Sequence, residues 1–287
     1  MLSTPMSRRK FLKKSMQWSC ALVGAASLSG VYSRYIEPYW IEVNAVEVAI
    51  RSLPRSFDQL RIVHFSDLHL GFHSSPELLV ELVEQIEQSK PDLICFTGDL
   101  LDQSTSYITE AIAVLSKLRA PFGQFAVLGN HDAFGNRRAV TRGLSQAGFH
   151  VLHNEHIALS RGTDQIYVAG IDDPWVGKPD IQQALLQIPE EACTVLLAHE
   201  PDFADEYSEL PIDLQLSGHS HGGQVRFPFL GALYTPPHGS KYSHGLYQIP
   251  HSRLQVYTNR GIGMTRMPVR FNCRPELTII TLKSQAD

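Results

Sequence analysis

Candidate metal ligands follow five apolar segments of the sequence. The segments RIVHFS, LICFT, FAVL, VLLA and LQLS are short and rich in branched or aromatic residues, which is typical of buried strands. The residues that follow them carry carboxylate, imidazole or amide groups: Asp67, His69, Asp99, Asn130, His131, Asp132, His199, His219 and His221. Because ligand sites of open α/β sheets form beyond the carboxyl ends of the strands, we expect these distant residues to meet in one site.

Two pairs of these residues are two positions apart, Asp67 with His69 and His219 with His221. Side chains at positions i and i+2 of an extended backbone point to the same face and lie roughly 6.6 Å apart along the strand. An extended backbone after each strand would therefore direct both members of a pair at one site.

The donor types indicate which ions would bind. The candidate ligands offer oxygen or imidazole nitrogen and no thiolate, a set that suits Mn, Fe, Zn or Mg rather than a structural cysteine zinc site. They are Asp67, His69, Asp99, Asn130, His199, His219 and His221. This set is too large for one tetrahedral ion, so two divalent ions that share a ligand fit better. An aspartate can bridge two ions through its two oxygens, whereas a neutral imidazole cannot.

Helices and strands alternate along the first half of the chain. Residues 61–67 and 92–99 read as strands, and the helical spacing of apolar residues in 76–90 predicts a helix between them, which together make a βαβ unit. Further helices are expected at 107–119 and 137–147, and further strands at 41–50, 122–129, 166–171, 194–199, 214–219, 254–259 and 276–282. The last two strands follow one another with the alternation of antiparallel strands. The predicted fold class is α/β, with two packed sheets flanked by helices, and no linker divides the body into further domains.

The ordered blocks DLH, GD, GNHD, a lone histidine after VLLA, and GHSH resemble those of the calcineurin-like binuclear metallophosphoesterases. The resemblance implies a four-layer α-β-β-α sandwich of two mixed sheets, formed by a single domain over residues 40–285. It also implies roles for the site residues. Asp67, His69 and His221 would hold one ion, Asn130, His199 and His219 the other, and Asp99 would bridge them. His131 would face the leaving group without binding metal. Ser220 stands where the family often has threonine, so a hydroxyl is retained.

The two ends of the chain resemble more specific sequences. Residues 218–228, 241–247 and 259–282 are similar to a branch of exported or membrane-associated bacterial phosphodiesterases within this superfamily. The N-terminal SRRKFLK, followed by the weakly polar residues 18–32, resembles a twin-arginine export signal with Arg8 and Arg9 as its pair. We therefore expect residues 1–33 to be a signal segment, recognised by the twin-arginine export machinery. The destination would be the periplasm, the cell wall or the outer face of the membrane, and membrane association stays open.

Charge and cysteine content exclude several classes of protein. The formal net charge is −4, but five basic residues lie within residues 1–29. Without them, 20 basic residues face 29 acidic ones, a net charge of −9 that disfavours nucleic-acid binding. The four cysteines are far apart and form no CxxC pair, so neither a zinc knuckle nor a dense disulfide framework is encoded.

The sequence therefore predicts a metal-dependent phosphoesterase. A metal-bridging hydroxide would attack a phosphodiester or phosphomonoester, small or lipid-linked, and His131 would protonate the leaving group. Asp132 would orient the imidazole of His131. Two alternatives stay open: a pyrophosphate-cleaving hydrolase of a nucleotide-linked lipid precursor, and a metal-binding scaffold without catalysis. Arg260, Arg266 and Arg270 are candidates to contact a substrate phosphate or to lie on the solvated surface.

Overall fold

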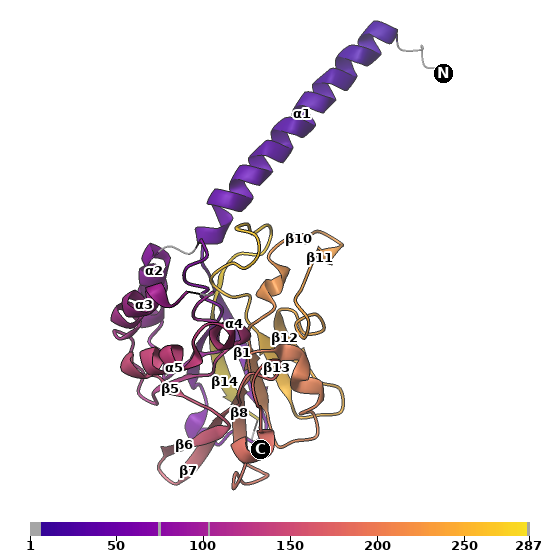
Figure 1. Ribbon diagram of the computed structural model, residues 1–287. Helices are drawn as coiled ribbons and strands as arrows, with labels where there is room; N and C mark the ends of the chain where they lie inside the picture. Colours follow the sequence, from indigo (N-terminus) through magenta and orange to yellow (C-terminus); the bar gives the residue numbers. More distant parts are fainter. Residues whose placement is uncertain (1–6, 74–75, 103, 286–287) are drawn as a thin grey trace.

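Two six-stranded mixed sheets form the centre of the protein. The computed structural model describes residues 7–73, 76–102 and 104–285 (Figure 1). The first sheet has the order β1-β14-β2-β3-β4-β5 and the second has the order β12-β13-β9-β8-β7-β6. The strands of the first sheet are β1 (Glu42–Ile50), β2 (Arg61–Phe65), β3 (Leu93–Phe96), β4 (Gln124–Ala126), β5 (His150–Val151) and β14 (Glu276–Ser284). Those of the second are β6 (Glu155–Arg161), β7 (Asp164–Gly170), β8 (Cys193–Leu197), β9 (Leu214–Ser217), β12 (Gly245–Gln248) and β13 (Gln255–Thr258).

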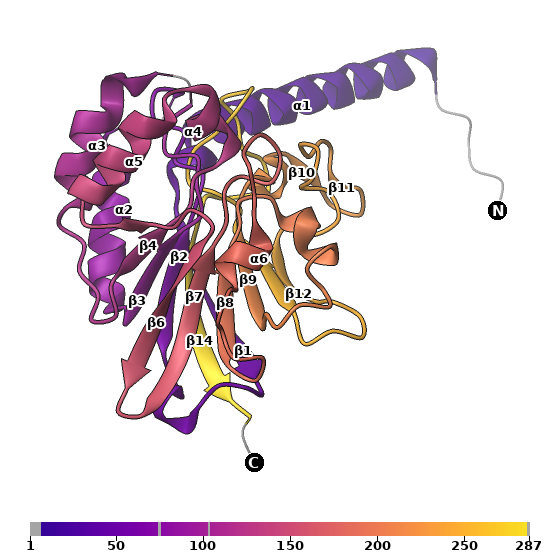
Figure 2. The ribbon, with the colours of Figure 1, turned by 60° about the horizontal axis from the view of Figure 1, so that its bottom comes forward.

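Helices cover the outer faces of both sheets unequally. Three α-helices, α2 (Pro76–Ser89), α3 (Ile108–Leu115) and α5 (Arg137–Gln146), lie against the first sheet (Figure 2). The second sheet is covered by the short α6 (Ile181–Ala184), the 3₁₀ helix η4 (Pro201–Asp205) and loops. The remaining short elements are η1 (Glu37–Tyr39), η2 (Arg55–Phe57), η3 (Thr105–Tyr107), α4 (Asn130–Phe134), η5 (His221–Gly223), and the hairpin of β10 (Arg226–Phe227) and β11 (Gly231–Ala232). The predicted α/β fold of two mixed sheets flanked by helices is confirmed.

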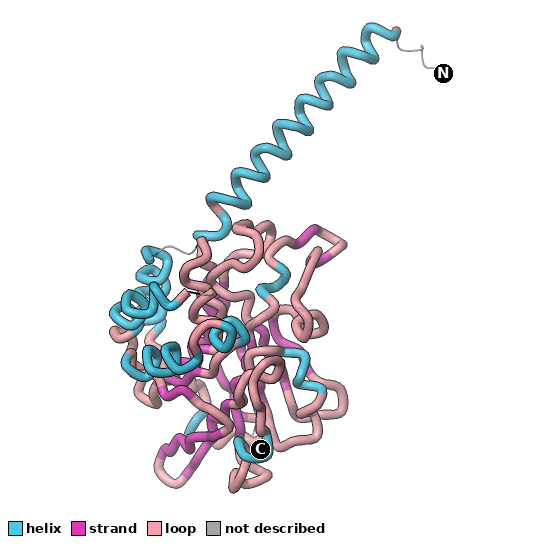
Figure 3. The backbone as a smooth tube through the Cα atoms, viewed as in Figure 1, coloured by secondary structure: helices cyan, strands magenta, loops and turns pink. Residues whose placement is uncertain are grey.

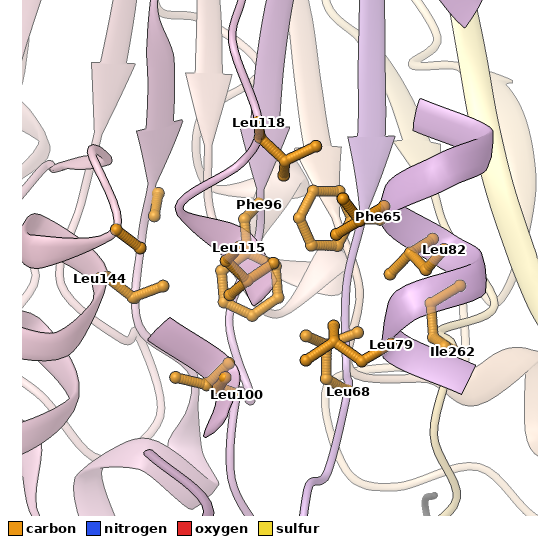
Figure 4. Packing of buried hydrophobic residues seen from close by; sticks show 14 of the residues in the cluster. Phe65, Leu68, Leu79, Leu82, Phe96, Leu100, Leu115, Leu118, Leu144 and Ile262 are labelled. Atoms are coloured by element: carbon orange, nitrogen blue, oxygen red, sulfur yellow. The ribbon is translucent and has the colours of Figure 1, made fainter. Parts of the chain in front are cut away.

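Apolar packing explains this layering. The predicted helical face of α2 is buried, and Leu79 and Leu82 pack towards Phe65 and Phe96 of the first sheet (Figure 4). The rings of those two phenylalanines lie 5.0 Å apart. A second cluster, including Ile62 of β2, Val168 of β7 and Tyr257 of β13, fills the space between the two sheets. Burial of these faces on both sides of each sheet holds the strand ends in fixed relative positions.

Strand pairing agrees with the sequence interpretation in the first half and differs in the second. β2 and β3 pair in parallel on either side of α2, as a βαβ unit requires. The two last predicted strands each have one antiparallel and one parallel neighbour. β14 is antiparallel to β2 but parallel to β1, and β13 is antiparallel to β12 but parallel to β9. Alternation of side chains does not distinguish these directions, because it reports only that one face is more exposed.

The N-terminal helix α1 (Arg8–Tyr35) projects away from the sheets (Figures 1 and 3). It contributes no buried residue, and Ser7 caps its first turn by accepting a hydrogen bond from the Lys10 amide. Its last turn meets the body, where the carbonyl oxygen of Ser33 accepts from the amide of Arg270 at 3.0 Å. Within the described residues, no helix combines the length and apolar character needed to cross a membrane. The predicted signal segment thus coincides largely with this helix, and its residues 1–6 lie outside the described part of the chain.

Candidate metal centre

Loops after five strands meet at one edge of the two sheets. Asp67, His69 and Asp99 follow β2 and β3 of the first sheet, and Asn130 begins α4 after β4. His199, His219 and His221 follow β8 and β9 of the second sheet. All of these side chains are buried, with at most 4% of their surface exposed. The structure therefore brings together every candidate ligand that the sequence singled out.

Asp67, His69 and His221 form the first group. Asp67 Oδ1 lies 3.3 Å from His221 Nε2 and 3.7 Å from His69 Nε2. The two Nε2 atoms lie 3.0 Å from each other. Three donor atoms that converge in this way are arranged as they would be around a single cation.

Asn130, His199 and His219 form the second group. Asn130 Oδ1 lies 3.0 Å from His219 Nδ1, and the rings of His199 and His219 are 5.1 Å apart between centroids. The other nitrogen of each ring is held by the backbone. His199 Nδ1 lies 2.6 Å from the carbonyl oxygen of Thr97, and His219 Nε2 lies 2.8 Å from that of Pro237.

Asp99 lies between the two groups. Its Oδ2 atom is 3.1 Å from His199 Nε2 in the second group and 3.5 Å from His69 Nε2 in the first. Its Oδ1 atom accepts a hydrogen bond from the backbone amide of His131 at 2.8 Å. One carboxylate thus faces both groups, which is the geometry of a shared ligand.

The second group offers electron-pair donor atoms that suit a cation better than they suit hydrogen bonds with one another. A carbonyl oxygen only accepts, so His199 donates from Nδ1 to Thr97 and presents Nε2 to Asp99. Burial alone would lower the pKa of His199, but the Asp99 carboxylate raises it well above its ordinary value, so Nε2 carries a proton that a metal ion would replace. His219 donates from Nε2 to Pro237 and turns its Nδ1 lone pair towards Asn130 Oδ1. The last two atoms are both acceptors and repel each other, and a divalent ion between them would remove the repulsion. The donor set of the chain therefore fits metal ions.

The electrostatics of the site favour positive charge. Burial alone would raise the pKa of Asp99, but His199 and His69 beside it hold that pKa below its ordinary value. Burial alone would lower the pKa of His69, but hydrogen bonding to Asp102 and the other nearby carboxylates raise it to about 9. Burial lowers the pKa of His219 to about 3 and that of His221 to about 4, so these imidazoles are neutral and able to bind metal at neutral pH.

The backbone of the site residues differs from the extended geometry that their spacing suggested. Asp67, His69, His219 and His221 have φ values of 53°, 43°, 66° and 51°, and Asp99 has 57°. These values lie in the left-handed region, which costs a non-glycine residue about 1–2 kcal/mol. The expectation of an extended backbone at the two pairs is therefore wrong. Both members of a pair converge because left-handed turns redirect the chain.

Two glycines permit the close approach of these loops. A Cβ atom on Gly218 would lie 2.2 Å from Asp67 Oδ2, and one on Gly129 would lie 2.3 Å from Asp99 Oδ1. Neither contact is sterically possible, so any side chain at these positions would displace a candidate ligand.

His131 lies beside the two groups and lines the adjoining cavity. Its Nδ1 atom donates to the carbonyl oxygen of Asp102 at 3.0 Å and lies 3.3 Å from the Asp102 carboxylate. The Nε2 atom is therefore the nitrogen of His131 that can exchange a proton with a bound molecule. Asp102 also lies 3.5 Å from His69 Nδ1, so one carboxylate contacts both imidazoles.

Asp132 does not orient His131 as the sequence suggested. Its carboxylate accepts hydrogen bonds from the amides of Asp99, Leu100, Leu101 and Gly129, at 2.8–3.3 Å. Residues 131 and 132 are neighbours on α4, and adjacent residues of a helix do not face each other. Asp132 thus joins the loop after β3 to the loop after β4, and the carboxylate beside the His131 ring belongs to Asp102.

Sequence reasoning missed two acidic residues of the site. Asp102 follows Asp99 by three positions, in a loop where nothing in the local pattern marks it. Glu200 is buried next to His199, and one of its oxygens lies within 4.8 Å of nitrogens of His199 and His219. Its place two positions after the fourth apolar segment, next to His199, was the available signal, because ligand sites form beyond the carboxyl ends of strands.

An apolar cavity of about 640 Å³ opens beside the candidate ligands. Aromatic and aliphatic residues form much of its wall: Phe72, Phe134, Trp175, Val225, Leu233, Tyr234 and Met267. Among the three arginines considered from the sequence, Arg266 lines this cavity. Arg260 pairs with Glu276 and Glu42, and Arg270 is fully buried against backbone carbonyls. Arg266 is thus the one of these three arginines that lies where a substrate would bind.

Comparison with known proteins gives matches along most of the chain. A model of the calcineurin-like phosphoesterase family matches residues 60–223. The uncharacterized metallophosphoesterase YkuE of Bacillus subtilis (strain 168) is 42% identical over 285 residues, which cover 97% of this chain and 98% of that protein. The phosphodiesterase YaeI of Escherichia coli (strain K12) is 32% identical over 285 residues, 96% of this chain and 99% of that protein. The 5'-nucleotidase precursor from Thermus thermophilus aligns in structure with a TM-score of 0.48 and 17% identity, over 77% of this chain and 54% of that one.

Proposed function

Because this chain belongs to the calcineurin-like phosphoesterases and is a hydrolase of phosphoric esters, we propose that it cleaves phosphodiester or phosphomonoester bonds at a centre of two divalent ions. The observation that carries this proposal is the position of Asp99. Its carboxylate contacts His199 on one side and His69 on the other, at 3.1 and 3.5 Å. A single-ion site has no use for a carboxylate placed between two complete groups of donors.

The distances between the side chains suggest which residues would bind each ion. Asp67, His69 and His221 would hold one ion, Asn130, His199 and His219 the other, and Asp99 would be shared. When bound, two divalent ions supply a nucleophile from water at neutral pH and stabilise negative charge on the phosphoryl oxygens. Arg266 at the cavity wall adds a fixed positive charge that attracts the phosphate group of a substrate.

His131 acts as the general acid in this proposal. Its Nδ1–H is engaged with the Asp102 carbonyl, so Nε2 carries the proton that passes to the departing oxygen. The Asp102 carboxylate, 3.3 Å from Nδ1, helps to hold the ring in this orientation. Asp102 is a positioning residue, because it acts through the imidazole.

A reconstitution experiment tests the proposed function. The metal-free protein is reloaded separately with Mn, Fe, Zn and Mg, and turnover is measured on a panel of phosphate mono- and diesters with metal analysis of each sample. We expect hydrolysis with at least one metal at two ions per chain. Asp99→Asn is the control, since losing the shared carboxylate should lower occupancy of both positions. Two bound ions in the variant would show that Asp99 is not the bridge.

The apolar cavity favours a second candidate reaction. Its largely apolar wall would accommodate the hydrocarbon part of an amphipathic substrate, as in a nucleotide-linked lipid precursor cleaved at its pyrophosphate. Adding such a pyrophosphate to the panel separates the two reactions. A much higher kcat/KM for the pyrophosphate than for every simple ester would favour the second candidate.

We also propose export through the twin-arginine pathway, to the periplasm, cell wall or outer membrane face. The supporting features are the Arg8–Arg9 pair and a helix α1 that contributes no buried residue to the body. Removal of such a segment leaves the core intact. Fractionation of cells expressing the chain and an Arg8→Lys/Arg9→Lys variant tests this, because the variant should accumulate in the cytoplasm. Equal export of both chains would contradict the proposal.

A further inference from the structure

Large apolar side chains are exposed at the rim of the cavity. The β10–β11 hairpin and the nearby loop present Phe227, Phe229, Leu230, Leu233 and Met267, which we call the apolar rim. Phe229 at the hairpin turn is fully exposed, and Leu230 beside it is 77% exposed. Exposed apolar residues gathered on adjoining loops mark a binding surface more often than isolated ones do.

The two parts of the rim belong to one surface. Gln224, just before the hairpin, donates to the carbonyl oxygens of Thr265 and Met267 at 3.0 and 3.2 Å. Leu233 and Met267 are both rim residues and cavity residues. The rim therefore borders the cavity beside the candidate metal centre, and whatever covers the rim also lies next to that cavity.

Charge around the rim distinguishes one kind of partner. The sequence has no acidic residue from 214 to 275 but has seven basic ones, in a body that is otherwise acidic. Most of them are paired with acids from other segments, as Arg253 is with Asp213. Within the described residues, Arg226 and Arg266 have no ion pair, and Arg266 stacks on the Tyr234 ring at 4.5 Å. An apolar turn flanked by arginines that have no acidic partner is complementary to a surface that is both apolar and anionic.

The basic N-terminal segment leaves the body next to this surface. Ser33 at the end of α1 is bonded to Arg270, three residues after Met267, and α1 and the hairpin lie at the same end of the body (Figures 1 and 2). Residues 1–36 contain no acid and carry the cluster Arg8, Arg9, Lys10, Lys13 and Lys14. Cations on this segment and at the rim would both be attracted to anionic headgroups.

We propose that the apolar rim is a docking surface for an anionic lipid bilayer. Phe229 and Leu230 insert below the headgroups, and Arg226 contacts lipid phosphates. A bilayer fits better than another protein, because the segment 214–275, which forms the rim and has no acidic residue, matches the uniform negative charge of anionic lipid. Docking holds the cavity entrance at the membrane surface. Binding requires no turnover, so this inference goes beyond the proposed function.

Vesicle co-sedimentation of the full chain tests the docking surface. Vesicles of phosphatidylcholine alone are compared with vesicles that also contain phosphatidylglycerol. We expect binding to be at least about 10-fold tighter with the anionic lipid, and Phe229→Ser/Leu230→Ser to weaken that binding at least about 10-fold. The matched control is Leu186→Ser, which removes another exposed leucine and should bind as the unchanged chain does.

Several results would overturn the proposal. If the hairpin variant binds vesicles as well as the unchanged chain does, the binding belongs to α1 alone. If the unchanged chain does not bind vesicles, the rim is not a lipid surface. If the unchanged chain is a dimer that the hairpin substitutions dissociate, the rim binds a second copy of the chain. Neither Phe229 nor Leu230 lines the cavity, so turnover of a soluble ester should be unchanged in the variant and confirms its fold. As a second probe, Phe229→Trp should add fluorescence quenched by brominated anionic lipid, and no added quenching would also refute insertion.

Discussion

Replacing Asp132 by asparagine should destabilise the protein rather than only its catalysis. The two carboxylate oxygens divide four backbone amides between them. Oδ2 accepts from Asp99 and Gly129, and Oδ1 accepts from Leu100 and Leu101. In asparagine one of these oxygens becomes an NH₂ group, which would face two N–H donors whichever way the amide is turned.

The expected magnitude follows from these contacts. Asp132 is fully buried, and burial together with the nearby Asp99 carboxylate raises its pKa to about 7, so the comparison is made well above that pH, where the carboxylate is charged. A hydrogen bond to a charged group contributes about 1.5–3 kcal/mol. The loss of two such bonds should therefore lower the free energy of unfolding by about 3–6 kcal/mol. That is a large fraction of the roughly 5–15 kcal/mol by which folded proteins are typically stable. The Asp99 loop would lose its anchor, so metal affinity should fall as well.

Urea denaturation of the metal-free protein measures this effect, and calorimetric metal titration measures the affinity. The matched control is Asp102→Asn. Asp102 has 16% of its side chain exposed and contacts the rings of His131 and His69, so we expect its loss to change stability by less than about 1 kcal/mol while lowering kcat. An Asp132→Asn protein as stable as the unchanged chain, with kcat reduced instead, would refute this reasoning and restore Asp132 as the partner of His131.

Four further predictions follow from the same contacts. His131→Ala should keep both ions by metal analysis but lose about 10²–10⁴-fold in kcat on an ester with a poor leaving group and less on an activated aryl ester, whereas equal losses would count against the acid role. Burial lowers the pKa of His64 from 6.5 to about 4, so as the pH falls His64 is protonated in the unfolded chain before it is protonated in the folded one. The free energy of unfolding should therefore fall by about 2 kcal/mol between pH 7 and pH 5. Urea denaturation should show a smaller fall in the His64→Gln variant. Arg270→Met should lower the free energy of thermal unfolding by about 3 kcal/mol or more, because the guanidinium donates to several buried carbonyl oxygens. Unchanged stability together with a raised KM would show instead that Arg270 contacts the substrate. Chelation of the metals should lower the melting temperature, since Asp67 and Asp99 lose the cations between them, and calorimetry with and without chelator would detect an unchanged midpoint if no ion binds there.

The sequence predicted which residues would meet, because their position is set by strand ends. Asp67, Asp99 and His199 each come within two positions of the end of a buried apolar segment, and sheet formation brings such ends to one edge. The alternation of strands and helices likewise predicted the βαβ unit around α2. Both features depend on periodicity and burial, which a single sequence records well.

The sequence could not predict the details that depend on contacts between distant segments. The left-handed φ values of His69 and His219 are imposed by the surrounding loops, since neither residue favours that conformation by itself. The partnership of Asp102 with His131 joins two loops, and no local pattern encodes it. In the sequence, Arg260, Arg266 and Arg270 are equal candidates for contact with a substrate phosphate. Only the fold shows that Arg260 and Arg270 form structural contacts, whereas Arg266 lines the cavity.

The candidate ligands straddle a seam, with Asp67, His69 and Asp99 contributed by one sheet and His199, His219 and His221 by the other. Neither sheet alone supplies the complete set of candidate ligands, and a small shift of one sheet relative to the other would separate the two parts of the set. The apolar residues between the sheets, such as Ile62 and Val168, therefore set the distance between the two groups of candidate ligands. Substitutions among these apolar residues should therefore affect turnover, although their side chains do not contact the substrate.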